Sequence, residues 1–303
     1  MHTSKEGLLS VKFAMGQLLV EGGEPARNLE RAVEMIRRAA KSQCDLVLLP
    51  EVLDLGWTHP SAKNEAMPIP GAYSDVLTAA AKENRIYVCA GLTELDGQTV
   101  YNSAILIDDS GEILLKYRKI NALDVEQEFY AIGTTLNVID TKFGRLGLNI
   151  CADNYFDSLH IGHTLARMGA QIILSPSSWT VGHDVTEEND PYGEKWMKPY
   201  RVLAEYHDLV ILGTTSVGYI VGGPYEGKKM VGSSLAVSRE GLLAKGIYNE
   251  FAGELIPVEF TVPVRKEKGT DIGIRLKSMG YVFDEPPPRS KWSRDFHKKP
   301  QRG

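Results

Sequence analysis

The sequence predicts an α/β fold. Short apolar runs of strand length alternate with stretches of helical periodicity along most of the 303 residues. Several of these runs are continuously apolar, which is typical of strands that are buried on both faces. Alternation of this kind places sheets inside and helices outside, and a chain of this length can bury a large core.

The first half of the chain is expected to begin with a strand and a helix. The helix opens at Glu24-Pro25, because proline is tolerated in a first turn, and its apolar residues recur at helical spacing. A loop rich in Pro and Gly follows at 56–71. The apolar positions of the helix are Leu29, Ala32, Val33, Ile36 and Ala40. The expected strands are 11–18, 45–50, 86–93, 100–107 and 113–117, and a second helix is expected at 73–84.

The second half offers strand, helix and strand in a comparable order. This similarity predicts a structural pseudo-repeat without a repeat of sequence. The expected helices are 157–168 and 196–206, and the expected strands are 136–140, 146–150, 172–175, 209–214, 233–237, 242–247 and 255–260.

The pattern degrades from about Pro263, where a triple proline and a basic tail follow. We therefore expect a domain over 1–262 and a C-terminal arm over 263–303. The arm is either an extended, partly disordered terminus or a segment that wraps a partner subunit.

Composition excludes several classes of protein. With 43% hydrophobic and 24% charged residues the chain is not of the disordered class, and a net charge of -5 does not favour nucleic-acid binding. We expect no membrane span and no signal peptide, because no apolar run is long enough. Three widely spaced cysteines form neither a disulfide framework nor a C-x-x-C metal pair, so a cytoplasmic location is expected.

Cys151 is the most informative residue. It follows the apolar run 146–150 and precedes polar residues, so it sits at a junction that projects a side chain from the sheet and leaves backbone N–H groups free. By itself it is either a nucleophile or a buried structural thiol. Cys44 and Cys89 adjoin or lie inside apolar strands and are expected in the core.

Three charged residues are candidate partners for this thiol. Glu51 directly follows the buried strand 45–50, where a carboxylate is costly unless it is paired or used. Lys119 follows the strand 113–117, and Glu126 lies in the acidic loop after it. Each residue also has a purely structural interpretation. Glu51 would cap the end of the sheet, Lys119 would be a solvated lysine at a sheet edge, and Glu126 would be a solvated acid in a loop.

Taken together, these residues resemble the nitrilase superfamily of carbon–nitrogen hydrolases. The resemblance covers roughly residues 11–262, and it includes two supporting frames around Asn102 and Ser175. It implies a four-layer α-β-β-α sandwich and a catalytic set of Glu51, Lys119 and Cys151. The family's second glutamate usually lies seven residues before a loop glycine, so Gly133 points to Glu126 over Glu128. The three frames that carry the resemblance are Leu48-Leu49-Pro50-Glu51, Tyr117-Arg118-Lys119-Ile120 and Gly147-Leu148-Asn149-Ile150-Cys151-Ala152-Asp153.

The chain departs from the family's usual pattern at three places. Asn121 stands where many members have His. Asn154 begins the stretch where several carbamoylases place Arg, and the absence of this Arg puts recognition of a substrate carboxylate in doubt. Nitrilases usually show Cys-Trp-Glu, whereas this chain has Cys151-Ala152-Asp153, which favours an amide or ureide over a nitrile.

The expected chemistry is hydrolysis of a non-peptide C–N bond. Glu51 takes the proton of Cys151, a thioester forms, and Lys119 with the N–H of Ala152 holds the oxyanion. Glu126 orients Lys119 or the substrate. No cofactor or metal is implied, and the resemblance implies a homodimer or larger homo-oligomer. The alternatives are a nitrilase and a catalytically idle binding or scaffold protein of the same fold.

Other residues are weaker candidates. We expect Trp57, Ala152, Asn154 and Trp179 to contribute to substrate binding, although core packing explains the two tryptophans equally well. The insert 183–192 is acid-rich, and as a lid it would favour a cationic or neutral substrate. The glycine-rich run 222–229 lacks the Ser or Thr of a phosphate loop and is expected to be a hairpin loop. His160 and His163 are expected at the surface rather than on a metal.

Overall fold

The computed structural model describes residues 9–189, 192–249, 251–265, 277–278 and 280. The chain divides into two compact units, Met1–Glu267 and Lys268–Gly303. All of the helices and strands below belong to the first unit. The predicted C-terminal arm, 263–303, lies outside the described residues except for 263–265, 277–278 and 280.

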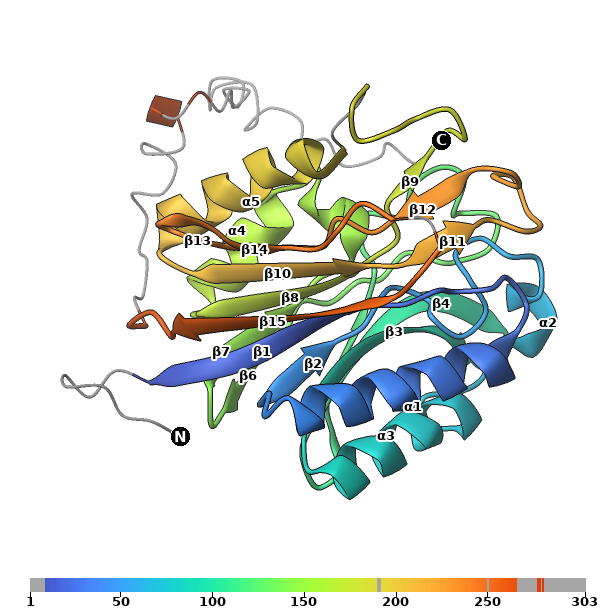
Figure 1. Ribbon diagram of the computed structural model, residues 1–303, viewed down its shortest axis with the longest axis horizontal. Helices are drawn as coiled ribbons and strands as arrows, with labels where there is room; N and C mark the ends of the chain where they lie inside the picture. The colour runs from blue at the N-terminus through green and yellow to red at the C-terminus, as the bar shows by residue number, and fades with distance from the viewer. Residues whose placement is uncertain (1–8, 190–191, 250, 266–276, 279, 281–303) are drawn as a thin grey trace, which may run out of the picture. The chain divides into compact units, whose positions relative to one another are not determined.

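Two six-stranded sheets form the centre of the first unit (Figure 1). The first sheet has the order β15-β1-β2-β3-β4-β5 and the second has the order β14-β13-β10-β8-β7-β6. The strands of the first sheet are β15 (Glu254–Thr261), β1 (Ser10–Gln17), β2 (Leu46–Leu48), β3 (Tyr87–Asp96), β4 (Thr99–Ile107) and β5 (Ile113–Arg118). Those of the second are β14 (Gly241–Lys245), β13 (Leu235–Ser238), β10 (Val210–Thr215), β8 (Ile172–Ser177), β7 (Gly144–Leu148) and β6 (Val138–Thr141).

Both sheets follow one pairing pattern. In each, three strands are parallel, a single antiparallel strand pairs with them on one side, and a pair of strands antiparallel to each other extends the sheet on the other. The parallel triplets are β1-β2-β3 and β7-β8-β10, and residues of the two triplets contact each other across the sheets. The topology thus confirms the expected pseudo-repeat.

Helices cover the outer face of each sheet (Figure 1). α1 (Pro25–Lys41) and α3 (Ala72–Asn84) pack on the first sheet, and α4 (His160–Arg167) and α5 (Tyr192–His207) pack on the second. In α1 the residues that recur at helical spacing, Leu29, Ala32 and Ile36 among them, are buried against the sheet. The result is the predicted four-layer α-β-β-α sandwich.

Burial explains why the parallel strands are continuously apolar. Every residue of β2 and β8 is buried, because each strand lies between a neighbouring sheet and a helix layer. The edge strand β15 instead alternates, with Ile256, Val258 and Phe260 buried and the residues between them exposed. Pro257 is tolerated there because the strand is at an edge.

The structure adds short elements that periodicity does not reveal. They are α2 (Ala62–Glu65), a 3-10 helix η1 (Cys151–Asn154) and a small third sheet of β11 (Val217–Tyr219), β12 (Lys229–Val231) and β9 (Thr180–Val181). The expected hairpin loop at 222–229 joins β11 to β12. The helix expected from 157 begins at His160, because η1 and a turn precede it.

Candidate active site

The structure brings Glu51, Lys119 and Cys151 to one edge of the two sheets. Glu51 follows β2 and Lys119 follows β5 in the first sheet, whereas Cys151 follows β7 in the second. These strand ends point the same way because β5 runs parallel to β3 through the antiparallel β4. The backbone N–H of Glu51 donates to Ser177 O at 3.3 Å, so the two sheets are joined at the site itself.

Close approach of the backbone around Glu51 requires a glycine. A Cβ at Gly91 of β3 would lie 2.5 Å from Glu51 Cα and 2.9 Å from Pro50 O. Any side chain at this position would therefore displace the turn that carries Glu51.

Lys119 lies between two carboxylates in a fully buried cluster. Its Nζ donates to Glu51 Oε1 and to Glu126 Oε1, each at 2.8 Å, and the three side chains are at most 1% exposed. A lysine ammonium has three hydrogens, so one remains after these two bonds. Removing one member of such a buried ionic group typically destabilises a protein by about 3–5 kcal/mol.

Glu126 is the most heavily hydrogen-bonded acid of the site. Its Oε1 also accepts from Trp57 Nε1 at 2.7 Å, and its Oε2 accepts from the backbone N–H of Leu123 at 2.8 Å. Glu128, in contrast, is exposed and pairs with Lys63 at 3.1 Å. The structure therefore places Glu126, and not Glu128, beside Lys119.

Asn102 is a member of the cluster that strand and loop positions alone did not single out. Its Nδ2 donates to Glu51 Oε1 at 2.6 Å and lies 3.3 Å from Glu126 Oε1. The available signal was the polar pair Asn102-Ser103 directly before the apolar run 104–107 of β4, because a buried amide needs polar partners. Within the described residues, Glu51 Oε2 has no hydrogen-bond partner.

Burial and charge set the protonation of the cluster. Burial raises the pKa of the Glu51 carboxyl; Lys119 opposes this shift and Glu126 adds to it. Burial would lower the pKa of Lys119, but the charges of Glu126 and Glu51 outweigh it and hold that pKa well above its ordinary value. Burial and the charge of Glu51 raise the pKa of the Cys151 thiol. Cys151 is therefore a neutral thiol that needs a base, and Glu51 is a basic carboxylate.

Cys151 lies in a strained turn. Its φ of 42° falls in the left-handed region, which costs a non-glycine residue of order 1–3 kcal/mol unless the surroundings hold it. Asp153 holds it: its carboxylate accepts from Tyr117 Oη, from the N–H of Asn121 and from the N–H of Ile150, at 2.7–2.8 Å. The same strand-end strain exposes nucleophiles in other hydrolases.

Asn121, which stands where many members of the superfamily have His, supports the same turn. Its Nδ2 donates to the carbonyl of Ala152 at 2.7 Å and to Ser158 Oγ at 3.0 Å. The carbonyl of Ala152 therefore already accepts a hydrogen bond. The N–H of Ala152 lies in the first turn of η1, where backbone N–H groups have no acceptor within the helix.

A cavity of about 200 Å³ opens onto Cys151 and Lys119. Of the expected substrate-binding residues, Trp57 lines it. Trp179 is fully buried and stacks at 4.8 Å on Trp196, which does line the cavity. Asn154 is buried as well, with its amide bonded to Asn149 and Ser175. The other lining residues are Leu123, Tyr155, Ser178, Thr180, Lys195, Trp196, Tyr225 and Lys228.

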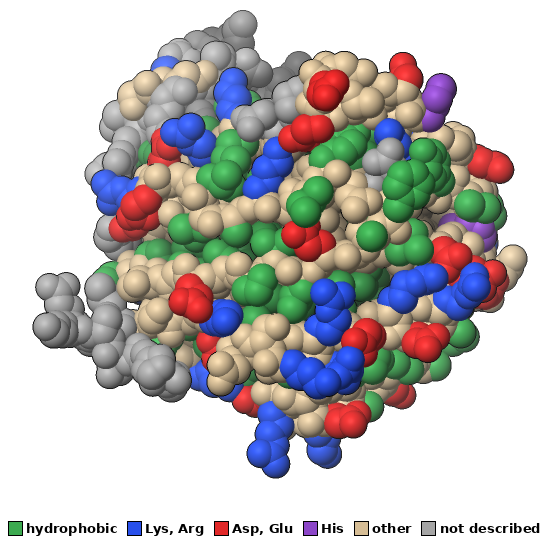
Figure 2. All heavy atoms as spheres, in the orientation of Figure 1, with side chains coloured by type: hydrophobic (Ala, Val, Ile, Leu, Met, Phe, Trp, Pro, Cys, Tyr) green, Lys and Arg blue, Asp and Glu red, His purple; other side chains and the backbone are tan. Residues whose placement is uncertain are grey.

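The acid-rich insert does not face this cavity in the part of the chain that the structure describes. None of residues 183–189 lines it, and Glu187 pairs with Lys245 at 2.6 Å. Asp190 lies outside the described residues. On the face shown in Figure 2, acidic and basic side chains are interspersed without a large patch of one sign.

Neither a metal site nor a membrane-spanning helix is present among the described residues. No group of three or more His, Cys, Asp or Glu side chains is arranged to hold a metal ion. His163 is buried and contacts His207 at 2.8 Å, which corrects the expectation that it lies at the surface, whereas His160 is exposed. In the same ranges, no helix has both the length and the apolarity to span a bilayer.

Comparison with known proteins gives the family. The sequence model of the carbon–nitrogen hydrolase family matches residues 13–264. A nitrilase of Pyrococcus abyssi is 31% identical over 231 residues, which cover 75% of this chain and 82% of the nitrilase. An omega-amidase of Saccharomyces cerevisiae is 31% identical over 59% of this chain and 67% of the yeast protein. For an omega-amidase of Mus musculus, identity is 30% over 51% of this chain and 59% of the mouse protein.

Solved structures agree on the fold. An amidase from Nesterenkonia sp. superposes with a TM-score of 0.72 at 19% identity, covering 92% of this chain and 98% of the amidase. The match of the family model along most of the chain and the likeness to the Pyrococcus nitrilase carry the assignment. The chain belongs to the carbon–nitrogen hydrolase family, the nitrilase superfamily of enzymes that cleave non-peptide C–N bonds.

Proposed function

We propose that the protein hydrolyses the C–N bond of a small amide or N-carbamoyl compound through a thioester on Cys151. The observation that carries the proposal is the buried cluster of Glu51, Lys119 and Glu126 at the cavity onto which Cys151 opens. Several relatives are named omega-amidases. In structures of the Nesterenkonia amidase, acrylamide and an acetamide moiety are bonded to that enzyme's active-site cysteine.

Acylation begins with a proton transfer. Glu51 takes the Sγ proton of Cys151 on Oε2, the oxygen that Lys119 and Asn102 leave unoccupied. The sulfur then attacks the carbonyl carbon, and the carbonyl oxygen becomes an oxyanion. The third hydrogen of Lys119 and the N–H of Ala152 are the donors for this oxyanion, and losing one such donor typically costs about 3–4 kcal/mol of barrier.

The same base completes both half-reactions. Glu51 returns its proton to the leaving nitrogen as the C–N bond breaks, which releases ammonia or an amine and leaves a thioester. Water then loses a proton to Glu51 and attacks the thioester carbon. Collapse of the second oxyanion breaks the C–S bond, and the thiolate of Cys151 takes the proton back from Glu51. Lys119 stays protonated throughout, because its pKa lies well above its ordinary value.

The test is ammonia release from a panel of simple amides and N-carbamoyl compounds, with the matching nitriles included. We expect activity on amides or N-carbamoyl compounds, none on the nitriles, and complete loss in Cys151→Ala. Cys44→Ala is the matched control, because Cys44 is a free, equally shielded thiol that does not line the cavity. An active Cys151→Ala enzyme would refute the mechanism, turnover of nitriles alone would identify a nitrilase, and an inert wild type would favour an idle binding protein.

A further inference from the structure

We propose that Asp54 is a positioning residue for the catalytic base: its buried carboxylate holds the segment 51–59 against β3 and so fixes the position of Glu51. This inference rests on the proposed function, in which Glu51 is the base for Cys151, and adds a residue that the mechanism itself does not use. It is carried by the contacts of Asp54, by the strain in the segment and by the two ends of the segment.

Asp54 is an acidic residue that is fully buried outside the catalytic cluster. Its Oδ2 accepts a hydrogen bond from the backbone N–H of Thr93 at 2.9 Å, and its Oδ1 accepts from the Thr93 hydroxyl at 3.1 Å. In the part of the chain that the structure describes, no ion pair compensates its charge. Burial of a carboxylate without a cationic partner is costly, so this side chain requires an explanation.

The contacts of Asp54 join three parts of the chain. Its side chain binds β3 through Thr93, whereas its backbone carbonyl accepts from Asn28 Nδ2 of α1 at 2.8 Å. One residue earlier, the N–H of Leu53 donates to Gly91 O at 3.0 Å, and Gly91 is the glycine of β3 that the turn with the catalytic base approaches closely. Asp54 therefore extends the attachment of this segment to β3 beyond the turn.

Two strained residues lie on either side of Asp54. Val52 has a φ of 38° and Thr58 a φ of 57°, both in the left-handed region. β-branched residues rarely adopt this region, and no other β-branched residue that the structure describes does so. A strained backbone keeps its conformation only where the surrounding contacts over-determine it. The carboxylate of Asp54 supplies such a contact between the two strained positions.

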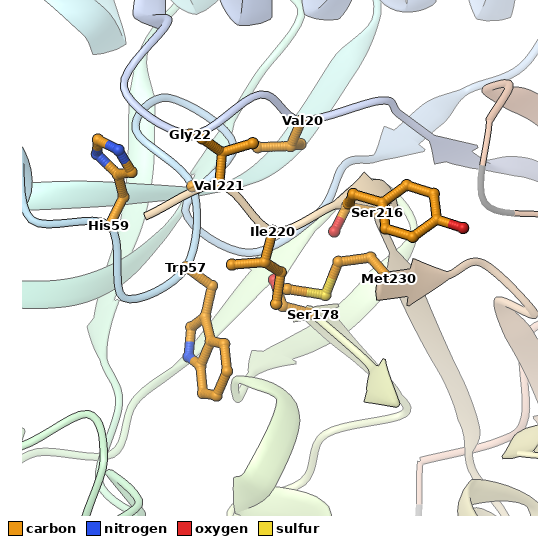
Figure 3. Close-up of a pocket in the computed structure, with 11 residues that line it drawn as sticks. Val20, Gly22, Trp57, His59, Ser178, Ser216, Ile220, Val221 and Met230 are labelled. Carbon is orange, nitrogen blue, oxygen red and sulfur yellow. The ribbon is translucent and has the colours of Figure 1, made fainter. Parts of the chain in front are cut away.

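Both ends of the segment serve the catalytic cluster. At one end, Glu51 Oε1 accepts from Lys119 at 2.8 Å. At the other, Trp57 Nε1 donates to Glu126 at 2.7 Å, and Trp57 also lines the catalytic cavity. Figure 3 shows Trp57 and His59 at this second end, where both line a separate cavity of only about 20 Å³. A displacement of the middle of the segment would therefore move both the base and the tryptophan.

The protonation of Asp54 offers a way to observe this role. Burial raises the pKa of its carboxyl to about 6, although hydrogen bonds from the N–H groups of Thr93 and Leu55 oppose the shift. A protonated carboxyl carries an O–H donor in place of one acceptor, so it holds these N–H groups less well. Asp54 also acts on the pKa of Tyr73 and Tyr130, but burial raises both above the ordinary 10, so neither tyrosine ionises near neutral pH.

The test is Asp54→Asn, which keeps the shape of the side chain and replaces one acceptor oxygen by an NH₂ group. Well above pH 6, kcat should fall about tenfold, because displacing a catalytic group is costly, and KM should stay within about twofold, because Asp54 does not line the cavity. Below about pH 6 the ratio of wild-type to variant kcat should fall towards one, because Glu51 titrates in both enzymes and Asp54 only in the wild type. A ratio that is constant with pH, or a loss in KM alone, would overturn the inference.

Asp108→Asn is the matched control. The carboxylate of Asp108 also accepts from backbone N–H groups in a turn, those of Ser110 and Glu112, each at 2.9 Å. This turn joins β4 to β5 at the opposite end of β5 from Lys119, so kcat of the control should stay within about twofold of the wild type.

The rate at which iodoacetamide alkylates Cys151 gives a second measurement that needs no substrate. Because Glu51 takes the thiol proton, alkylation of Cys151 in Asp54→Asn should slow by about the same factor as kcat, while that of Cys44 stays unchanged. Thr93→Val removes only the hydroxyl donor to Asp54 and should slow alkylation of Cys151 by about two- to tenfold, which tests the inference even where Asp54→Asn does not fold. Unchanged alkylation of Cys151 in either folded variant would overturn the inference, whereas absence of turnover of all amides by the wild type would overturn the proposed function itself.

Discussion

Replacing Glu126 by Gln removes one negative charge from the buried cluster and changes its shape little. The wild-type Oε1 accepts from Lys119 and Trp57, while Oε2 accepts from the N–H of Leu123. A glutamine offers one oxygen and one NH₂ group, so one orientation sets NH₂ against the N–H of Leu123 and the other sets it against Lys119. Either way a charge-assisted bond is weakened or a buried donor loses its acceptor.

The size of the effect follows from these bonds. A hydrogen bond to a charged group contributes about 1.5–3 kcal/mol, so misplacing Lys119 should lower kcat/KM by about 10- to 100-fold. The charge of Glu126 also raises the pKa of Glu51. Without that charge the pKa of Glu51 falls, and the acid limb of the kcat/KM profile should move to lower pH.

The assay is kcat/KM against pH for Glu126→Gln and for Glu128→Gln. Glu128 lies two residues on, is exposed, and pairs with Lys63 at the surface, so its variant should stay within about twofold of the wild type. A Glu126→Gln enzyme with wild-type activity, or an acid limb that moves to higher pH, would refute the reasoning.

Two further predictions concern acid stability and thiol reactivity. Burial of Glu94 would raise the pKa of its carboxyl, but hydrogen bonds from Arg118 and Lys116 outweigh burial and lower this pKa from 4.5 to about 2. Ionised Glu94 therefore stabilises the folded protein above pH 4.5, and this stabilisation is lost as the pH falls towards 2. The free energy of unfolding of Glu94→Gln should therefore be about 3 kcal/mol below that of the wild type at pH 7. Urea unfolding at a series of pH values should show this difference shrinking below pH 4.5, and a difference that stays constant would contradict the prediction. Iodoacetamide at neutral pH should modify Cys151 before Cys44 and Cys89, because only Cys151 opens onto a cavity with a base beside it; peptide mapping that finds Cys44 labelled first would contradict this.

Strand ends are predictable from the sequence because their signals are local. Apolar runs end at Leu49, Tyr117 and Ile150, and each is followed within two residues by a residue of the cluster or by Cys151. Because the strands of such a sheet are parallel, their carboxyl ends lie at the same side of the sheet, and this placement follows from the fold class alone. The choice of Glu126 over Glu128 needed the resemblance to a family, because both acids lie in one short loop and only packing separates them.

The substrate-binding wall is less predictable because it depends on contacts between distant segments. Trp179 and Trp196 stack on each other near the site, but only Trp196 lines the cavity, and the sequence does not distinguish the two. From the sequence alone, Lys228 is expected to be a solvated lysine of a hairpin loop. In the structure, Gly223 of this loop packs on Thr58, and Lys228 lines the cavity. The amide of Asn154 bonds to Asn149 and to Ser175 of the neighbouring strand β8, and nothing in the immediate sequence of Asn154 reveals the second partner.

The hydrogen bond between Glu51 and Ser177 has a consequence for the two halves of the chain. The half that contains β2 and β5 supplies the acid–base groups, and the half that contains β7 supplies the sulfur. Although the halves share one strand order, neither holds a complete set of reactive groups. A change that weakens the packing between the two sheets would therefore move the sulfur of Cys151 away from Glu51. The rate of turnover depends on how the two halves pack together as well as on the identity of the catalytic residues.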